Sequence, residues 1–205
     1  MTEQLSLFGW EPPKSPKKLR SEPPFGNMKY NIFFAMFLDS TAGQKAFDVG
    51  AEQARLYGLS GRPQAIERLH FTLFGLGGYA EFPSEIVEVA EWIGDQIKGR
   101  VFEVTLDMVM SYRAKEGTAA PLVLAGESGM TDLVVFQRQF SVLLSRLGAS
   151  SKQSFSPHVT LLRDRRSVPR QPIAKITCKM REFVLVNSLL GQTLYVHLKR
   201  WALEP

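Results

Sequence analysis

The sequence His70-Phe71-Thr72-Leu73 occurs again in the second half of the chain as His158-Val159-Thr160-Leu161. The chain has three histidines in 205 residues, so two of them in one His-x-Thr-Leu pattern are hard to attribute to chance. Because residues two apart in a β-strand share one face, each copy predicts a strand with an imidazole and a hydroxyl on one face and apolar side chains on the other. Two such strands side by side would surround a small anion with two acid/base groups and two hydroxyl donors.

These four side chains suit chemistry at a phosphodiester. An imidazole has an ordinary pKa near 6.5, so near neutral pH one histidine can accept a proton while the other donates one. His70 and His158 are therefore the candidate catalytic residues, and the hydroxyls of Thr72 and Thr160 are candidate donors to phosphate oxygens. A single histidine on such a strand is more often structural, and the repetition of the pattern is what favours catalysis.

The composition excludes several other kinds of site and of protein. Cys178 is the single cysteine, so an internal disulfide or a cysteine-based metal cluster cannot form, and histidine is too scarce for a zinc site. We therefore expect no metal and no cofactor. The net charge of +5 would attract a polyanion such as RNA. No apolar run approaches the roughly 18 residues that span a bilayer, and no leader pattern is present at the N-terminus, so we expect a cytoplasmic protein with no membrane partner. We also expect a monomer.

Beyond the paired motifs, the chain resembles the 2H phosphoesterase superfamily, and within it the bacterial RNA 2′,3′-cyclic phosphodiesterases, also called 2′-5′ RNA ligases. The resemblance runs from about Tyr30 to Leu203 and is carried by segments 32–36, 68–73, 156–163 and 187–188, with Tyr195 and Trp201. The most specific block is Pro157-His158-Val159-Thr160-Leu161 followed by Arg163, since family members read Pro-His-x-Thr-Leu and then a nearby arginine.

The resemblance implies an α+β, bilobed fold in which two antiparallel sheets with flanking helices surround a central cleft, related by a pseudo-twofold axis. Residues 1–27 are rich in proline and basic residues and are predicted to be a disordered tail, followed by one 2H phosphoesterase domain over 28–205. Sequence periodicity predicts a helix capped by Ser40 or Thr41 and ending near 57, a second from Pro83 to about 97 and a third over 131–147. Strands are expected at 28–38, 68–76, 101–112, 121–125, the second motif, 175–188 and 192–203.

The activity implied by the resemblance is opening of a 2′,3′-cyclic phosphate at an RNA end to give a 2′-phosphate, with a reverse 2′-5′ ligation that needs no ATP. The resemblance favours His70 as the acid and His158 as the base, although nothing in the sequence distinguishes them. The partners would be RNA ends or small cyclic-phosphate nucleotides. Two alternatives stay open: a phosphodiesterase acting on a cyclic nucleotide or ADP-ribose cyclic phosphate, and an RNA-binding module without useful turnover.

Several further residues are candidates for contacting the substrate. Arg163 would bind phosphate; the alternative is a solvated arginine at a strand end, which strict alternation favours because Arg163 shares parity with Val159 and Leu161. Arg62 and Arg68 flank the first motif and are candidates for holding the RNA backbone, or else ordinary surface arginines. Tyr30 or Phe34 would stack on a base, whereas core packing is the alternative for whichever of Phe33 and Phe34 faces inward. His197 lacks a companion threonine, which favours a structural or surface role.

A short apolar segment in the tail suggests a separate partner. Gln4-Leu5-Ser6-Leu7-Phe8 resembles the pentapeptide by which bacterial replication and repair proteins dock on the DNA sliding clamp. A short apolar segment in a disordered arm is free to reach a partner and to order on binding. The alternatives are that these side chains pack on the protein's own surface or that so short a match is fortuitous.

Overall fold

The computed structural model describes residues 28–114, 117–147 and 155–205. The predicted tail and the Gln4–Phe8 segment lie outside the described residues. Within the described part, the helices are α1 (Ser40–Tyr57), α2 (Ser84–Gln96) and α3 (Thr131–Arg146). The strands are β1 (Tyr30–Phe37), β2 (His70–Tyr79), β3 (Phe102–Ser111), β4 (Ala120–Ala125), β5 (Val159–Asp164), β6 (Gln171–Met180), β7 (Glu182–Leu189) and β8 (Leu194–Ala202). Among the described helices, none is both long and apolar enough to cross a membrane.

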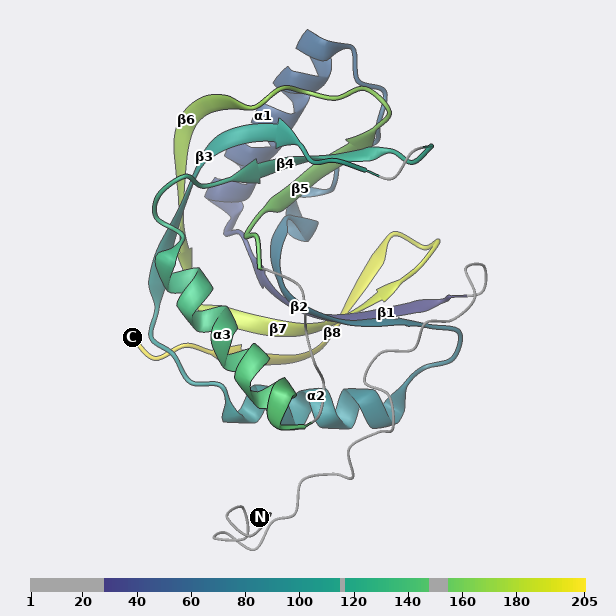
Figure 1. Ribbon diagram of the computed structural model, residues 1–205, viewed down its shortest axis with the longest axis vertical. Helices are drawn as coiled ribbons and strands as arrows, with labels where there is room; N and C mark the ends of the chain where they lie inside the picture. Colours follow the sequence, from purple (N-terminus) through teal and green to yellow (C-terminus); the bar gives the residue numbers. More distant parts are fainter. Residues whose placement is uncertain (1–27, 115–116, 148–154) are drawn as a thin grey trace, which may run out of the picture.

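The strands form one antiparallel sheet in the order β6-β3-β4-β5-β2-β1-β7-β8. Its two motif strands, β5 and β2, meet in the middle through a single registered pair, Phe71 and Val159. The prediction of two separate sheets is therefore not confirmed: four strands lie on each side of this one junction. In Figure 1 the half with β3 to β6 lies above the half with β1, β2, β7 and β8.

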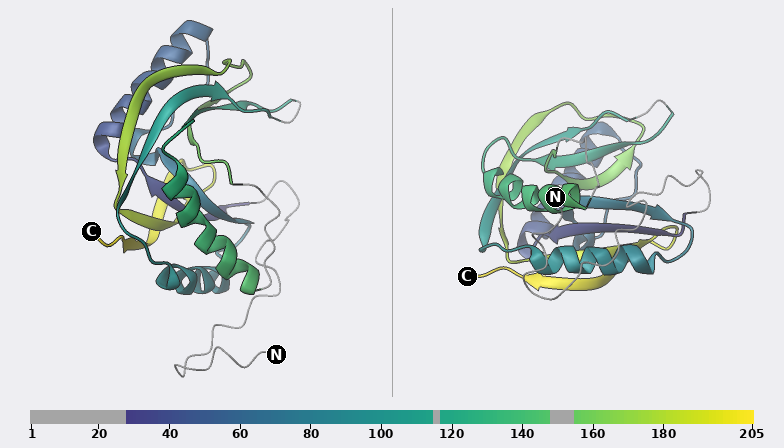
Figure 2. Two further views of the ribbon diagram at one scale, coloured as in Figure 1. Left: turned by 60° about the vertical axis from the view of Figure 1, so that its left-hand side comes forward. Right: turned by 60° about the horizontal axis from the view of Figure 1, so that its bottom comes forward.

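Helix α1 covers the half of the sheet to which its preceding strand does not belong, and α3 contacts both halves. Helix α1 follows β1 but packs against β5 and β6 of the other half, on its outer side in Figure 2. Helix α3 follows β4, and its Phe140 ring packs 4.7 Å from Phe34 of β1 and 5.6 Å from Phe183 of β7. The two halves therefore share one continuous hydrophobic core rather than folding as separate units.

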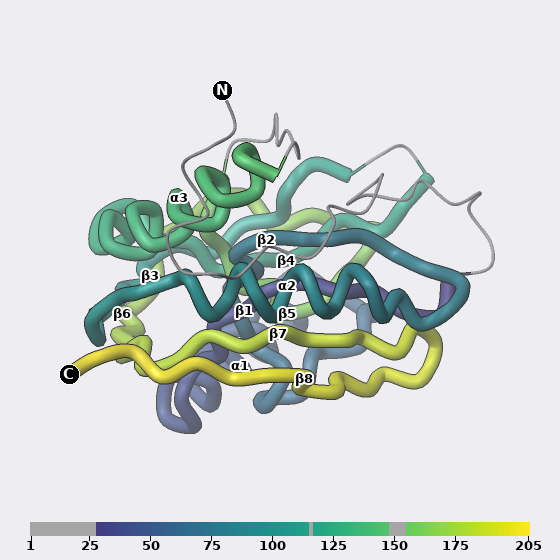
Figure 3. Tube along the Cα trace, turned by 90° about the horizontal axis from the view of Figure 1, so that it is seen from below, coloured from purple at the N-terminus to yellow at the C-terminus, as the bar shows by residue number. Residues whose placement is uncertain are grey.

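Helix α2 completes the cover of the second half. It packs against β7, β8 and α3, and Figure 3 shows it running alongside β7 and β8. A Cβ added at Gly94 would lie 2.2 Å from the Trp201 ring, so only glycine lets the helix approach β8 this closely. The helices thus leave the opposite face of the β2–β5 junction uncovered.

The local signals of α1 differ slightly from the prediction. Its cap is Asp39, whose carboxylate accepts a 2.8 Å hydrogen bond from the Ala42 backbone N–H, rather than Ser40 or Thr41. That hydrogen bond lowers the pKa of Asp39, because it favours the ionised carboxylate. The helix ends at Gly58, which adopts a left-handed conformation with φ of 61°.

The predicted strand over 175–188 is wrong, because the chain turns a corner at Arg181. Strand β6 ends at Met180 and pairs with β3 at one edge of the sheet, whereas β7 begins at Glu182 and lies between β1 and β8. The apolar pattern continues across the corner, since both strands bury side chains in the same core. Hydrophobic periodicity alone could not reveal that one run serves opposite halves of the sheet.

Candidate active site

The two His-x-Thr-Leu motifs meet at the junction of β2 and β5. Phe71 and Val159 are both fully buried on the helix-covered face of the sheet. The histidines and threonines on either side of them therefore point to the other face, where all four line one pocket of about 270 Å³. The pocket lining consists of Asn31, Phe33, Gln64, Arg68, His70, Thr72, Gly75, His158, Thr160, Arg163 and Tyr195.

Both imidazoles are held through the same nitrogen. Nδ1 of His70 lies 2.6 Å from the carbonyl oxygen of Arg68, and Nδ1 of His158 lies 2.8 Å from that of Ser156. A carbonyl can only accept, so Nδ1 donates in each ring and Nε2 is the nitrogen available for proton transfer. In the first motif Nε2 of His70 also lies 3.1 Å from Oγ1 of Thr72.

His70 stands among aromatic rings. The centroids of Phe33, Phe37 and Tyr195 lie 5.2, 5.4 and 5.6 Å from its imidazole. Burial lowers the pKa of His70 from its ordinary 6.5 to about 4; the hydrogen bond to the Arg68 carbonyl opposes this shift, and the nearby positive charges add to it. At neutral pH His70 is therefore uncharged in the free protein.

His158 has more open surroundings. Its one ring neighbour in the described chain is Tyr112, with centroids 5.0 Å apart. The Tyr112 hydroxyl lies 3.2 Å from Oγ of Ser156, the residue whose carbonyl holds the His158 ring. Tyr112 thus contacts both His158 and the segment that orients it.

Arg163 reaches the pocket because β5 contains a bulge. Leu162 pairs with Leu122, but Thr160 pairs with the next residue of β4, Val123, so Leu161 is an extra residue in the ladder. Leu161 and Leu162 are both buried, and the residue after them returns to the face of Thr160. The alternation argument against Arg163 is therefore wrong, since a bulge shifts the pattern by one residue.

The first motif contains the same irregularity. In β2, Thr72 pairs with Ala35 and Phe74 with Phe34, which leaves Leu73 as the extra residue. The residue that reaches the pocket three positions after the threonine is here Gly75. Gly75 is thus the positional equivalent of Arg163, and a Cβ added to it would meet no atom within 4 Å.

The remaining predicted residues are divided between the pocket and other places. Arg68 lines the pocket, with its guanidinium carbon 4.1 Å from the centroid of Tyr195. Arg62 lies in a neighbouring hollow instead. Tyr30 packs edge-on against Phe82, outside the pocket.

The prediction of base stacking by Phe34 is wrong. Phe34 is 0% exposed and belongs to the core. Phe33 is the aromatic residue of β1 that faces the pocket. His197 lies outside it, 4.8 Å from Phe37 between ring centroids.

Asp164, which sequence reasoning missed, joins the two motifs through the segment between α1 and β2. Its carboxylate accepts hydrogen bonds from the backbone N–H groups of Ser60, Gly61 and Arg166 at 2.6, 2.7 and 2.8 Å. These bonds lower the pKa of Asp164, that from Arg166 most strongly, although burial opposes the shift. The segment so held leads directly to His70, so this carboxylate fixes the second motif strand to the approach of the first. An aspartate directly after Arg163 at a strand end was the available signal.

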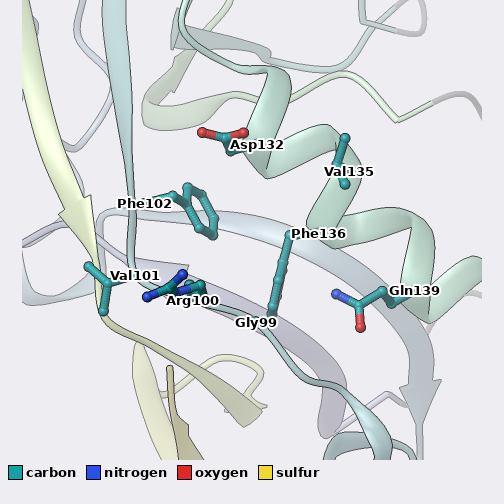
Figure 4. A pocket seen from close by; sticks show the side chains of 8 residues that line it. All are labelled: Gly99, Arg100, Val101, Phe102, Asp132, Val135, Phe136 and Gln139. Atoms are coloured by element: carbon teal, nitrogen blue, oxygen red, sulfur yellow. The ribbon is translucent and has the colours of Figure 1, made fainter. Parts of the chain in front are cut away.

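A hollow on another side of the molecule shows what a pocket without this chemistry looks like. It has a volume of about 300 Å³ and lies between α3 and the segment entering β3, and Figure 4 shows its side chains. It is lined by Gly99, Arg100, Val101, Phe102, Asp132, Val135, Phe136 and Gln139, with no histidine. Among the described residues, no group of three or more His, Cys, Asp and Glu could hold a metal ion.

Paired histidines and threonines from two adjoining strands at the centre of an α+β fold define a 2H phosphoesterase. No family model matches the chain. It is 31% identical over 150 residues to the RNA 2′,3′-cyclic phosphodiesterase of Escherichia coli K12, a match that covers 70% of this chain and 81% of that protein. The chain therefore belongs to the RNA 2′,3′-cyclic phosphodiesterase family.

Solved structures support the same assignment. E. coli LigT complexed with 3′-AMP superposes with a TM-score of 0.70 at 25% identity, covering 86% of this chain and 99% of LigT. A second structure, described as a phosphoesterase, has a TM-score of 0.70 at 25% identity and covers 85% of this chain and 99% of its own. A Thermus thermophilus protein shares the fold, with a TM-score of 0.62 at 22% identity over 84% of this chain and 97% of that protein.

Proposed function

We propose that this protein hydrolyses the 2′,3′-cyclic phosphate at an RNA end to a 2′-phosphate by acid/base catalysis between two histidines, without a metal ion. The observation that carries the proposal is that one pocket contains both imidazoles, each with Nδ1 occupied, and both motif threonines. Family membership supports the same reaction, since the E. coli relative is named for it.

The reaction needs one proton removed and one supplied. The base takes a proton from water as its oxygen bonds to phosphorus, and the acid protonates O3′ as its bond to phosphorus breaks. We assign the acid to His70 and the base to His158, following the family resemblance. Thr72 and Thr160 donate hydrogen bonds to the non-bridging oxygens, where negative charge concentrates in the transition state. With a 5′-hydroxyl in place of water, the same steps form a 2′-5′ linkage without ATP.

The low pKa of His70 constrains how it can act as the acid. In the free protein the ring is neutral at pH 7, so it carries no spare proton. A phosphate anion beside a buried imidazole favours the charged form and raises its pKa. We therefore place the proton on His70 only in the substrate complex, where Arg163 pairs with the phosphate by two parallel hydrogen bonds.

The decisive experiment is a one-hour incubation of an oligonucleotide ending in a 2′,3′-cyclic phosphate, with EDTA present. We expect full turnover to the 2′-phosphate, identified by ³¹P NMR. Loss of activity in EDTA would contradict the metal-free mechanism. Binding without turnover would favour the RNA-binding module, and turnover of only a cyclic nucleotide or ADP-ribose cyclic phosphate would favour the other enzyme class.

We also propose, from sequence alone, that Gln4–Phe8 docks on the DNA sliding clamp. A glutamine followed by leucines and a phenylalanine suits insertion into an apolar surface groove. A peptide of residues 1–12 should bind the clamp with micromolar affinity, and the double substitution Leu7→Ala/Phe8→Ala should abolish binding. Deletion of residues 1–26 should leave phosphodiesterase activity intact. If the wild-type peptide does not bind, the match is fortuitous or the segment packs on its own protein.

A further inference from the structure

A second hollow adjoins the catalytic pocket. Its volume is about 450 Å³, against about 270 Å³ for the catalytic pocket, and the two share Gln64 and Arg68. Its lining consists of Phe47, Arg62, Pro63, Gln64, Ala65, Glu67, Arg68 and Thr193, so neither histidine motif contributes to it. The two hollows therefore adjoin at Gln64 and Arg68.

The walls of this hollow are tied to the catalytic strands. The backbone N–H of Gln64 donates a 2.7 Å hydrogen bond to the carbonyl of Leu161, the bulged residue of the second motif. On the opposite wall Thr193 precedes by two residues Tyr195, which lines the catalytic pocket. The geometry of the hollow is thus set by the same elements that position the histidines.

Arg68 stands at the boundary between the two spaces with an unused donor. Its guanidinium lies over the Tyr195 ring, and its Nε is buried without a hydrogen-bond partner among the described residues. A buried N–H donor without an acceptor is unfavourable, so the Arg68 side chain would gain a hydrogen bond by shifting toward an anionic oxygen in the hollow. Arg62 adds a second cation to the same hollow, whose one acidic lining residue is Glu67.

Thr193 has a strained backbone. Among the residues that the structure describes, it is the one residue other than glycine with a positive φ, 54°. This conformation is unfavourable for a β-branched side chain and easy for glycine, which already occupies the neighbouring left-handed position at Gly191. Strain of this kind persists where a side chain is needed, and here the side chain lines the hollow.

We propose that this hollow binds the nucleotide that precedes the terminal cyclic-phosphate nucleotide of an RNA, an inference that rests on the proposed function. A 2′,3′-cyclic phosphate closes the 3′ end, so an RNA chain can leave the catalytic pocket only through its 5′ side. Arg62 and Arg68 bind the phosphate that joins the last two nucleotides, and Gln64 and Glu67 face the polar edges of the preceding nucleoside. The site therefore selects RNA ends over cyclic mononucleotides.

The test compares three substrates that differ only on the 5′ side: adenosine 2′,3′-cyclic phosphate, the same compound with a 5′-phosphate, and the dinucleotide ApA with a terminal 2′,3′-cyclic phosphate. For the full-length protein we expect kcat/KM to rise along this series, by about tenfold or more overall. Values within twofold for all three substrates would overturn the proposal while leaving the proposed function intact. No turnover of any of them would instead overturn the proposed function.

Two variants, Arg62→Ala and Thr193→Gly, test the phosphate contact and the strained side chain separately. Arg62→Ala should reduce the dinucleotide preference by about three- to fivefold. It should also make the slope of log kcat/KM against log salt less negative by about 0.7, the value for one phosphate contact on a single strand. Arg138→Ala, which removes an exposed arginine from α3, is the matched control and should change neither quantity. An unchanged preference in Arg62→Ala, or an equal loss in Arg138→Ala, would contradict the proposal.

Thr193→Gly provides a readout that a purely structural role would not give. The substitution removes the side chain and relieves the strained φ, so the melting temperature should stay the same or rise. The dinucleotide preference should nevertheless fall by a few-fold. Retention of the full preference would show that Thr193 does not contact the preceding nucleotide and would remove the strain argument.

Discussion

The two histidine motifs have the same local structure and different surroundings. Both fix Nδ1 on the carbonyl two residues earlier, and both contain a bulge directly after the threonine. Yet His70 lies among three aromatic rings and has a lowered pKa, whereas His158 has one ring neighbour in the described chain. Arg163 of the second motif corresponds to Gly75 of the first. A repeated scaffold thus supplies two copies of one group in unequal environments, which suits the proposed division between an acid and a base.

Removal of either imidazole should have the largest effect. His70→Ala and His158→Ala should each lower kcat/KM by about 10²- to 10⁴-fold, the range for losing a general acid or base. The measurement is steady-state hydrolysis of a 2′,3′-cyclic-phosphate dinucleotide, with circular dichroism as the control for folding. If either variant kept a near wild-type rate, the two motifs would not share one reaction.

The threonine hydroxyls come next in expected effect. Thr72→Val and Thr160→Val keep the branched shape of the side chain but remove the donor, and each should lower kcat by about 10- to 1,000-fold. Thr72→Val should be the more damaging, because the Thr72 hydroxyl also contacts Nε2 of His70. Equal losses in the two variants would mean that this extra contact does not matter, and no loss would remove the hydroxyls from the mechanism.

The pair Arg163 and Gly75 tests the charge asymmetry. Arg163→Met should lower kcat/KM by about 10- to 100-fold, since it removes charged hydrogen bonds to phosphate worth roughly 1.5–3 kcal/mol. Arg163→Lys should recover only part of this loss, because an ammonium cannot form two parallel bonds. The matched Gly75→Ala should fold normally, as its added Cβ meets no atom within 4 Å. A rate within twofold of wild type for Arg163→Met would refute its role.

The lowered pKa of His70 predicts a smaller, pH-dependent effect on stability. The pKa of folded His70, about 4, lies below its unfolded value of 6.5, so between these pH values the unfolded state binds more protons. The free energy of unfolding should therefore decrease as pH falls from 6.5 to 4, with about 1–2 kcal/mol due to His70 after allowance for its partial exposure. Urea titrations should show that His70→Phe loses this component and His158→Phe keeps it. The same slope in both variants would contradict the assignment.

Sequence reasoning located the centre of the site because strand alternation is a local property. The period of two was sufficient to group His70 with Thr72 and His158 with Thr160 on one face. It could not say which of Phe33 and Phe34 faces the core, because alternation shows that the two side chains face opposite sides of the sheet but not which side is the core. It also could not find Gln64 in the pocket or Thr193 in the neighbouring hollow, because contacts between segments far apart in the chain bring them there.

The bulges after the threonines also limit how this site can be changed or transplanted. Each bulge adds one residue to its strand, so the side chains beyond it face the side of the sheet opposite to that expected from strict alternation. Deleting Leu161 would remove the bulge and leave Leu162 toward the core and Arg163 toward the pocket, but Arg163 would lie one residue, about 3.3 Å, nearer to Thr160 along the strand. A functional copy of the motif therefore comprises six residues rather than four, from the histidine to the pocket-facing residue three positions after the threonine.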